Sequence, residues 1–155
     1  MAGTCPDAIS AVDAVVEVTF DPEGVPTWED ISGEGNTVEP SEQTRMQAET
    51  YTFDCDVAIL TTGKREPVEV TVNVVYVEVT DSVYDKMDAA FKANDKIGVQ
   101  WFPSGKADGN WMFSISPALI SALQDPSLDA GVADPLMATF TVRAPEAVRS
   151  VYTAP

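Results

Sequence analysis

The sequence predicts a mainly β fold, a β-sandwich or partly closed barrel of about seven strands with one flanking α-helix. Apolar and polar residues alternate along several stretches, as they do in strands that bury one face. Turn-forming residues separate these stretches, and one stretch after Asp81 repeats its apolar residues at helical spacing. A chain of 155 residues fits one domain, so we assign residues 1–155 to a single folded unit.

The first half of the chain contains three predicted strands and a long polar connection. Residues 12–20 alternate as a half-buried strand, and residues 28–31 form a short second strand. Residues 33–47 are polar and rich in breakers, which predicts a long loop of the kind that is usually functional or disordered. Residues 48–60 alternate again as a strand, and a turn near Gly63 is expected to follow.

The clearest strand is 66–79, in which valines alternate with polar residues. A helix follows it. Asp81 or Ser82 can cap the start of this helix, and Asn94 can end it in a left-handed conformation. The apolar stripe of the helix predicts packing against the core.

The second half of the chain predicts a hairpin and one more strand. Residues 96–102 and 110–116 match in period, with turn residues between them. Residues 117–124 fit a short helix or a strand equally well. Residues 135–143 form the last predicted strand, and residues 144–155 form a tail with few apolar residues.

Negative charge is concentrated in the first part of the chain. The sequence has 25 Asp and Glu, 9 Lys and Arg and no His, for a net charge of -16. Residues 1–62 hold 13 acids and one base, a net of -12, and residues 63–155 hold 12 acids and 8 bases, a net of -4. This balance argues against direct nucleic-acid binding and against a membrane partner. No stretch approaches about 20 apolar residues, so no membrane-spanning helix is expected.

The predicted strand at 48–60 has one acidic face, because side chains alternate across a strand. The side chains on one face are mostly apolar: Glu49, Tyr51, Phe53, Cys55, Val57 and Ile59. The side chains on the other face are polar or small: Thr50, Thr52, Asp54, Asp56 and Ala58. On this interpretation Cys55 is a small buried hydrophobic residue.

Few residues could carry catalysis. Without His, the chain cannot form a Ser-His-Asp or Cys-His arrangement, and it lacks the commonest metal ligand. Asp54 and Asp56 could hold a hard cation such as Ca²⁺ or act as a glycosidase-like pair, but a solvated acidic face explains them more simply. We therefore expect no enzyme activity, no cofactor and no bound metal.

Several short strings occur in a fixed order over residues 10–145. They are Trp28-Glu29-Asp30-Ile31-Ser32-Gly33, a long polar loop, Tyr51-Thr52-Phe53-Asp54, Gly63-Lys64-Arg65-Glu66-Pro67, Val68-Glu69-Val70-Thr71-Val72 with Tyr76, and Trp101-Phe102-Pro103-Ser104-Gly105 with Gly109. By their order and spacing the chain resembles the major tail, or tail tube, proteins of long-tailed, non-contractile bacteriophages. The tube of bacterial type VI secretion is a more distant resemblance.

The resemblance implies a structural virion protein without catalytic residues. Such subunits join as hexameric rings, which stack into a tube that houses the tape-measure protein and conducts DNA during ejection without binding it specifically. It also implies tail terminator and distal tail proteins as partners, location in the virion tail, and assembly in the host cytoplasm. In this family the long loop between early strands contacts the neighbouring ring, which here corresponds to Gly33, Glu34, Asn36, Glu39, Glu42 and Arg45 within 33–47.

Polar faces on two strands joined near Gly63 suggest which residues line the channel. The candidates are Thr50, Thr52, Asp54, Asp56, Glu69, Thr71 and Asn73. An acidic or neutral lumen repels phosphates, whereas a basic lumen would hold DNA along its length.

Two other functions stay open from the sequence. A monomeric β-sandwich binding module on a virion or cell surface would use its loops for recognition, and its acidic face would simply be solvated. A carboxylate-dependent hydrolase would depend on Asp54 and Asp56, but no acid–base geometry in the sequence supports it.

Overall fold

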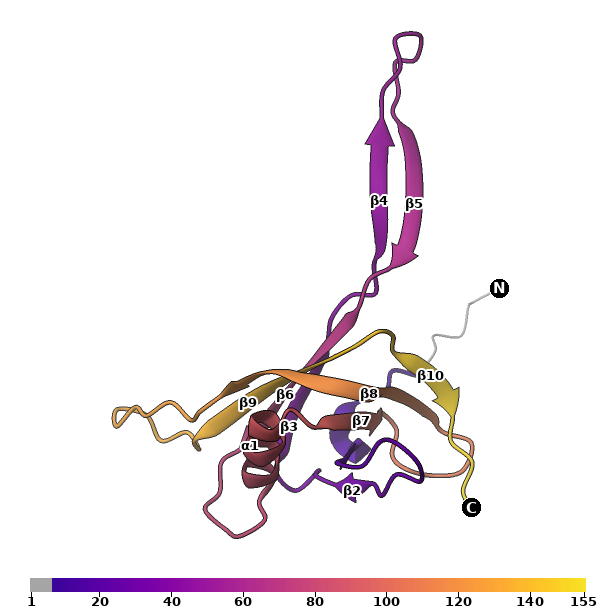
Figure 1. Ribbon diagram of the computed structural model, residues 1–155. Coiled ribbons are helices and arrows are strands. Elements are labelled where there is room, and N and C mark those ends of the chain that lie inside the picture. Colours follow the sequence, from indigo (N-terminus) through magenta and orange to yellow (C-terminus); the bar gives the residue numbers. More distant parts are fainter. Residues whose placement is uncertain (1–6) are drawn as a thin grey trace.

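The computed structural model describes residues 7–155. The chain begins with a short 3-10 helix, η1, and continues through ten strands and one α-helix (Figure 1). The elements are η1 (Ala11–Asp13), β1 (Val15–Thr19), β2 (Glu29–Asp30), β3 (Gly35–Pro40), β4 (Arg45–Thr50), β5 (Ile59–Arg65), β6 (Val68–Val75), α1 (Val83–Ala93), β7 (Lys96–Phe102), β8 (Trp111–Gln124), β9 (Met137–Ala144) and β10 (Val148–Val151).

An eight-stranded antiparallel sheet forms the body of the molecule. Seven of its strands follow the order β2-β1-β7-β8-β9-β6-β3, and β10 pairs with β8 beside this path. β4 and β5 pair with each other in a separate two-stranded sheet. The prediction of a mainly β fold with one helix is confirmed, and the larger sheet is not closed into a barrel.

The core lies where the inner faces of these strands meet one side of the helix. On β6 the valines Val68, Val70, Val72 and Val74 are buried, while the residues between them are exposed or half-buried. Phe140 and Val142 of β9 lie opposite Val72 and Val70 in the register. The alternation that predicted strand 66–79 therefore corresponds to β6, with the strand ending at Val75.

Helix α1 begins and ends at residues that the sequence identified. The Ser82 hydroxyl accepts a hydrogen bond from the Asp85 amide, so Ser82 rather than Asp81 is the N-cap. Asn94 is left-handed, with φ of 55°, and ends the helix. Val83, Met87 and Ala90 are buried in the core cluster, so most of the apolar stripe packs inward as predicted, but Phe91 at its end is exposed.

A side-chain contact ties the helix to the end of β8. Tyr84 donates a hydrogen bond to the Asp125 carboxylate, and this bond, with desolvation, raises the pKa of Tyr84 from 10.0 to about 12. A phenol whose pKa is higher in the folded than in the unfolded chain stabilises the fold below pH 10.0, and this contribution is lost as the pH rises through about 12.

We predict that Asp125→Asn lowers the pKa of Tyr84 toward 10.0, because the carboxylate that favours the neutral phenol is removed. The absorbance of tyrosinate during an alkaline titration measures this shift. Asp134→Asn, in the same exposed loop, is the control and leaves the titration unchanged. An identical titration curve for Asp125→Asn and the parent protein would show that the contact is absent in solution.

The first predicted strand is shorter and more deeply buried than expected. Val12 is exposed in η1, and the strand starts at Val15. Glu17 and Thr19, expected on a polar face, are buried. Gln100 and Lys106 both donate hydrogen bonds to the Glu17 carboxylate, and Lys106 Nζ lies 2.7 Å from it. These partners explain how β1 can carry a carboxylate on a covered face.

The C-terminal third contains more strand than the sequence indicated. Residues 117–124, left open between helix and strand, belong to β8. The predicted tail 144–155 contains β10, which pairs with the start of β8 through Val148 opposite Ser114 and Val151 opposite Trp111. A strand of only four residues is too short for alternation to identify, so β10 is recognisable only from its pairing with β8.

The sequence-based predictions differ most from the structure over residues 33–60. The predicted long loop 33–47 is wrong, because β3 and the start of β4 occupy most of it. The predicted strand 48–60 is also wrong, because β4 ends at Thr50 and the chain reverses over 51–58 before β5 begins. Gly63 lies within β5 and forms no turn.

Candidate functional surfaces

A long hairpin projects from the body and is the most prominent surface of the molecule. β4, the reversal at 51–58 and β5 form an arm that stands away from the main sheet (Figure 1). All of residues 41–67 are exposed except Ala58, which is half-buried. None of these residues belongs to the hydrophobic core cluster. The arm therefore contributes nothing to the core of its own subunit.

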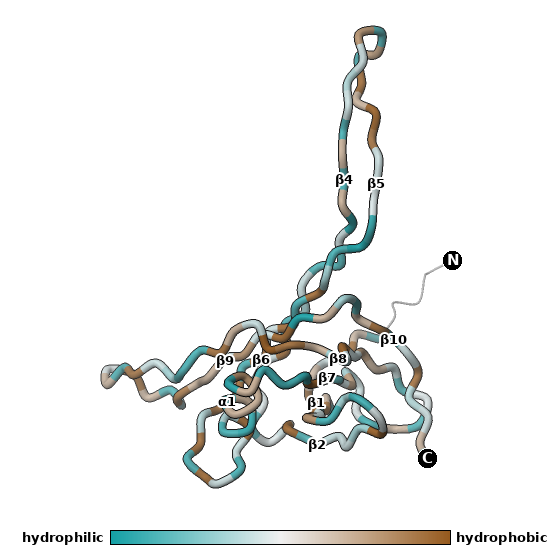
Figure 2. The backbone as a smooth tube through the Cα atoms, viewed as in Figure 1, coloured by the Kyte–Doolittle hydropathy of each residue, from teal (hydrophilic) through white to brown (hydrophobic). Residues whose placement is uncertain are grey.

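The two faces of the arm differ in character. Opposite residues in the register share a face, and one face carries Met46, Ala48 and Ile59 together with two threonines. The other face carries Glu49, Gln47, Leu60 and Thr62. Hydrophobic segments recur along the arm and near its end (Figure 2). Exposed apolar side chains in such a row are typical of an interaction surface.

The end of the arm, residues 51–58, combines exposed apolar residues with acids. Phe53 has a relative exposure of 110%, and Tyr51 and Val57 are also exposed. Asp54 and Asp56 lie among them. Cys55 is an exposed free thiol, so its prediction as a buried residue is wrong. The prediction failed because the apolar residues of 51–58 are not on one face of a strand.

Polar contacts join the two sides of the arm at its base, and an ion pair links the base to the body. The Glu66 amide donates to the Thr44 carbonyl oxygen, and the Thr44 hydroxyl donates to the Glu66 carboxylate. Arg65 forms an ion pair of 2.9 Å with Glu146, in the connection between β9 and β10. Both side chains of this pair are exposed, so it adds only a weak link between the arm and the body.

A second candidate surface is the polar face of β3, β6 and β9. Glu69, Thr71 and Asn73 of β6 lie on it, opposite the buried valines. In the register they face Arg143, Thr141 and Thr139 of β9, and Thr71 and Asn73 face Glu39 and Thr37 of β3. Apart from Val75 and Met137, which face each other at one end, this face is built from hydroxyl, amide and charged groups.

Hydrogen bonds run across this polar face and fix its side chains. The Thr139 hydroxyl donates to the Asn73 carbonyl oxygen, and the Asn73 amide donates to the Thr37 hydroxyl, each at 2.5 Å. The Thr71 and Thr141 hydroxyls lie 3.4 Å apart. A surface whose polar groups bond to one another has fewer free donors for a passing ligand.

The charge on the polar face is small. Glu39 and Glu69 contribute -2 and Arg143 contributes +1, which leaves a net of -1 on this face. Arg143 lies 3.9 Å from Glu69, so part of this charge is paired within the subunit. The face is therefore close to neutral, although the whole chain has a net charge of -16.

The predicted channel residues do not share one face. The prediction placed Thr50, Thr52, Asp54 and Asp56 beside Glu69, Thr71 and Asn73 on adjacent strands, and this premise is wrong. The first four lie at the end of the arm, whereas the last three lie on β6, whose neighbours are β3 and β9. Only the β6 group forms part of a continuous polar face.

The predicted ring-contact residues are also divided. Glu34 accepts a hydrogen bond of 2.9 Å from the Val83 amide, so its carboxylate supports the start of α1. Gly33 lies in a turn before β3, Asn36 and Glu39 lie within β3, and Glu42 lies between β3 and β4. Arg45 begins β4 at the base of the arm.

Within residues 7–155 no three His, Cys, Asp or Glu side chains come together as a set that could hold a metal ion. No helix in this range is long and apolar enough to cross a membrane. The two exposed surfaces, the arm and the polar face, are the features that a function must explain.

Comparisons with known proteins identify the fold. No protein-family model matches the chain, and no match is found among the curated proteins. A chain in the cryo-EM structure of the PVC sheath–tube complex, an extracellular contractile injection system in its extended state, is similar, with 15% identity, a TM-score of 0.70 and coverage of 94% of this chain and 93% of that one.

Two further structures are similar over nearly their whole length. The anti-feeding prophage tube-terminating cap gives a TM-score of 0.73 at 13% identity, over 98% of this chain and 97% of that one. A chain in the tail of an empty gene transfer agent particle, refined with C6 symmetry, gives 0.64 at 12% identity, over 94% of this chain and 100% of that one. At these identities the likeness establishes a shared fold.

Proposed function

We propose that this chain is a structural subunit of a phage-like tail tube. Copies join into hexameric rings, and the rings stack into a tube that houses a tape-measure protein and lets DNA pass during ejection. The protein acts in the virion tail, is assembled in the host cytoplasm, and meets a tail terminator and distal tail proteins at the ends of the tube. Its role is structural rather than enzymatic.

The exposed arm is the observation that carries this proposal. A two-stranded hairpin alone is marginally stable in water, because it has no layer to pack against. The arm nevertheless carries a row of exposed apolar side chains and an exposed aromatic end. A neighbouring copy that packs against the arm would supply the missing layer and bury these side chains.

The shared fold supports the same assignment. The similar chains come from a sheath–tube complex, a tube-terminating cap and a tail refined with C6 symmetry. These include contractile injection systems, so the non-contractile class named by the sequence resemblance stays a prediction. The proposal of a tube does not depend on that class.

The polar face of β3, β6 and β9 is our proposed lumen. We propose that Glu69, Thr71 and Asn73 face the lumen, as the sequence predicts. Asp54 and Asp56 lie at the end of the arm and are not part of this proposed lumen face. Every basic contact adds salt-dependent affinity for DNA phosphates, so a nearly neutral face of bonded hydroxyls lets DNA move. On this view, low affinity comes from few cations rather than from strong repulsion.

Assembly must overcome charge repulsion. Six copies would carry 6 × -16 = -96. Salt screens charges over about 8 Å at physiological ionic strength, so added salt is expected to favour assembly while apolar contacts of the arm hold it together.

Electron microscopy of concentrated pure protein tests the proposal. We predict rings or tubes in negative stain, with more assembly as salt is raised. Uniform monomers across protein and salt concentrations, and also in the presence of preformed tail ends, would instead favour a monomeric β-sandwich binding module.

A further inference from the structure

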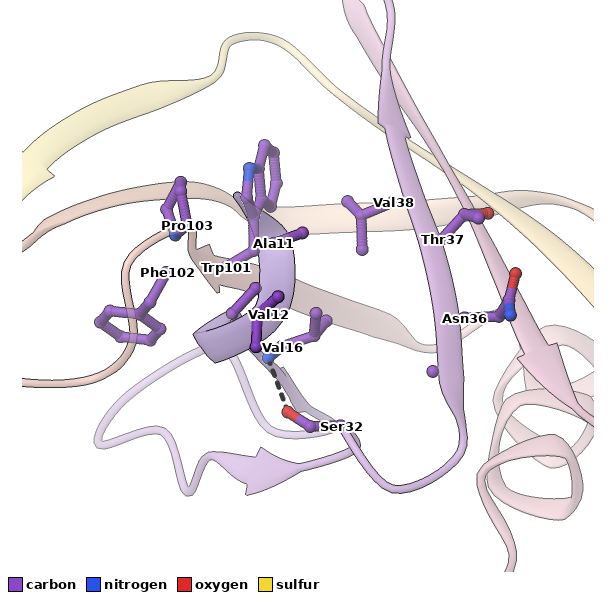
Figure 3. Close-up of a pocket in the computed structure, with 12 residues that line it drawn as sticks. Ala11, Val12, Val16, Ser32, Asn36, Thr37, Val38, Trp101, Phe102 and Pro103 are labelled. Carbon is purple, nitrogen blue, oxygen red and sulfur yellow. Dashed lines mark hydrogen bonds between the residues drawn. The ribbon is translucent and has the colours of Figure 1, made fainter. Parts of the chain in front are cut away.

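A pocket of about 390 Å³ opens on the body of the subunit between η1, β1, β3 and the end of β7 (Figure 3). Val12, Val16, Val38, Trp101, Phe102 and Pro103 supply most of its apolar lining. Trp101 stacks on Phe113 with ring centroids 5.7 Å apart, and Phe102 is fully buried, so two sides of the pocket are firmly packed.

Every described residue that lines this pocket is uncharged. This contrasts with two other pockets of the described chain, which are lined in part by Glu29, Lys86, Asp95 and neighbouring charged residues. In a chain of net charge -16, an uncharged apolar pocket is a place that an acidic partner can approach with little repulsion.

The end of the arm carries apolar side chains that could fill this pocket. Phe53 is fully exposed and is flanked by exposed Tyr51 and Val57. A cavity of about 150 Å³ lined by apolar residues already holds a benzene molecule, so this pocket has room for a phenyl ring and its surroundings. Aromatic side chains that enter apolar pockets commonly dominate the energy of protein interfaces.

A subunit cannot use its own arm in this way. The end of the arm stands far from the body, on which the pocket opens (Figure 1). The complementary partner is therefore a second copy. Because the end of the arm and the pocket are different surfaces, the contact between copies is head-to-tail. Such a contact extends into a ring or a filament rather than closing at two copies.

We propose that the arm of one copy inserts Phe53 into the pocket beside Trp101 of the next copy. This inference rests on the proposed function and names the receptor site that the arm uses. The acids Asp54 and Asp56 stay at the rim of the contact. The lining itself carries no carboxylate, and Asp13 lies beside it in η1.

Removing the Phe53 side chain tests the contribution of the arm to this contact. Phe53→Ala is expected to raise the protein concentration needed for assembly by about tenfold or more, because a buried aromatic anchor is lost. Leu128→Ala removes another highly exposed apolar side chain, from the loop between β8 and β9, and is expected to leave that concentration unchanged.

Filling the pocket tests the contribution of the pocket. Ala11→Trp places an indole at the pocket wall from the exposed residue Ala11, so it should block assembly without disturbing the core. Ala8→Trp adds the same side chain at an exposed position outside the pocket lining and should assemble as the parent does. Equal assembly of Ala11→Trp and Ala8→Trp would overturn the assignment.

The exposed thiol of Cys55 gives a direct measure of proximity. In a Cys5→Ser background, a photo-crosslinker attached to Cys55 is expected to join copies, with the crosslinked residue mapped by mass spectrometry to the pocket lining, such as Val12 or Val38. Crosslinks between copies that fall on another surface, while tubes still form, would overturn this inference and leave the proposed function standing. Neither tubes nor crosslinks between copies at any concentration of the parent protein would overturn both.

Discussion

A chain that lacks the arm is expected to fold and to stay monomeric. In this variant residues 46–64 are replaced by Asn-Gly, which joins Arg45 to Arg65, its partner in the register, through a two-residue hairpin turn. No core residue is removed, and β4 and β5 pair only with each other, so the free energy of unfolding should change by no more than about 1 kcal/mol. Assembly should be lost entirely, because the arm holds the apolar surface proposed to join copies.

Chemical denaturation and negative-stain microscopy check these two expectations separately. The control shortens the exposed loop 126–134, which also removes surface residues but leaves the arm intact, and this control should assemble. Normal tubes from the armless chain would refute the role of the arm. From the sequence alone, trimming 35–45 is expected to leave a folded monomer that forms no tubes, but that change removes β3, which pairs with β6 along the core, and is therefore expected to destabilise the fold.

Adding cations to the polar face is expected to make tubes retain DNA. Glu39→Lys with Glu69→Lys changes the net charge of this face from -1 to +3, or from -6 to +18 over six proposed copies. Both residues are exposed, so Glu39→Lys should alter stability by less than about 0.5 kcal/mol, whereas Glu69→Lys places a second cation opposite Arg143 and should cost about 1 kcal/mol. Short double-stranded DNA that enters such a lumen should then bind at least about tenfold more tightly at low salt, and this gain should fall steeply as salt is raised.

Co-sedimentation of labelled DNA with assembled tubes measures this effect. The matched control, Glu78→Lys with Asp134→Lys, makes the same change in total charge at exposed positions away from the polar face. It should leave DNA binding inside tubes unchanged. Equal DNA retention by the two double variants would show that total charge, and not the polar face, governs the interaction.

Much of the body of the fold could be predicted from local pattern. The valines of β6 alternate cleanly because that strand buries one face, and Ser82 and Asn94 mark the ends of α1 through capping geometry. The hairpin of β7 and β8 follows from matched alternation on either side of turn residues. In each case the residues that carry the signal are buried or capped within one subunit.

The arm could not be predicted in the same way. Tyr51, Phe53, Val57 and Ile59 fit the period of a half-buried strand, but the structure places them around a reversal where no core exists. Alternation reports that apolar residues are to be buried, and it cannot say whether their own subunit or another will bury them. The prediction that Glu17 lies on a polar face failed for a related reason. Its burial depends on hydrogen bonds from Gln100 and Lys106, which are distant in sequence.

A cryo-EM reconstruction of the assembled protein would show where the arm and the polar face lie in the tube. We predict stacked hexameric rings in which Thr71, Asn73 and Thr139 face the lumen and the arm of each copy packs against a neighbour. A tube with the face of β3, β6 and β9 on its outer wall, or with arms that contact no other copy, would contradict it.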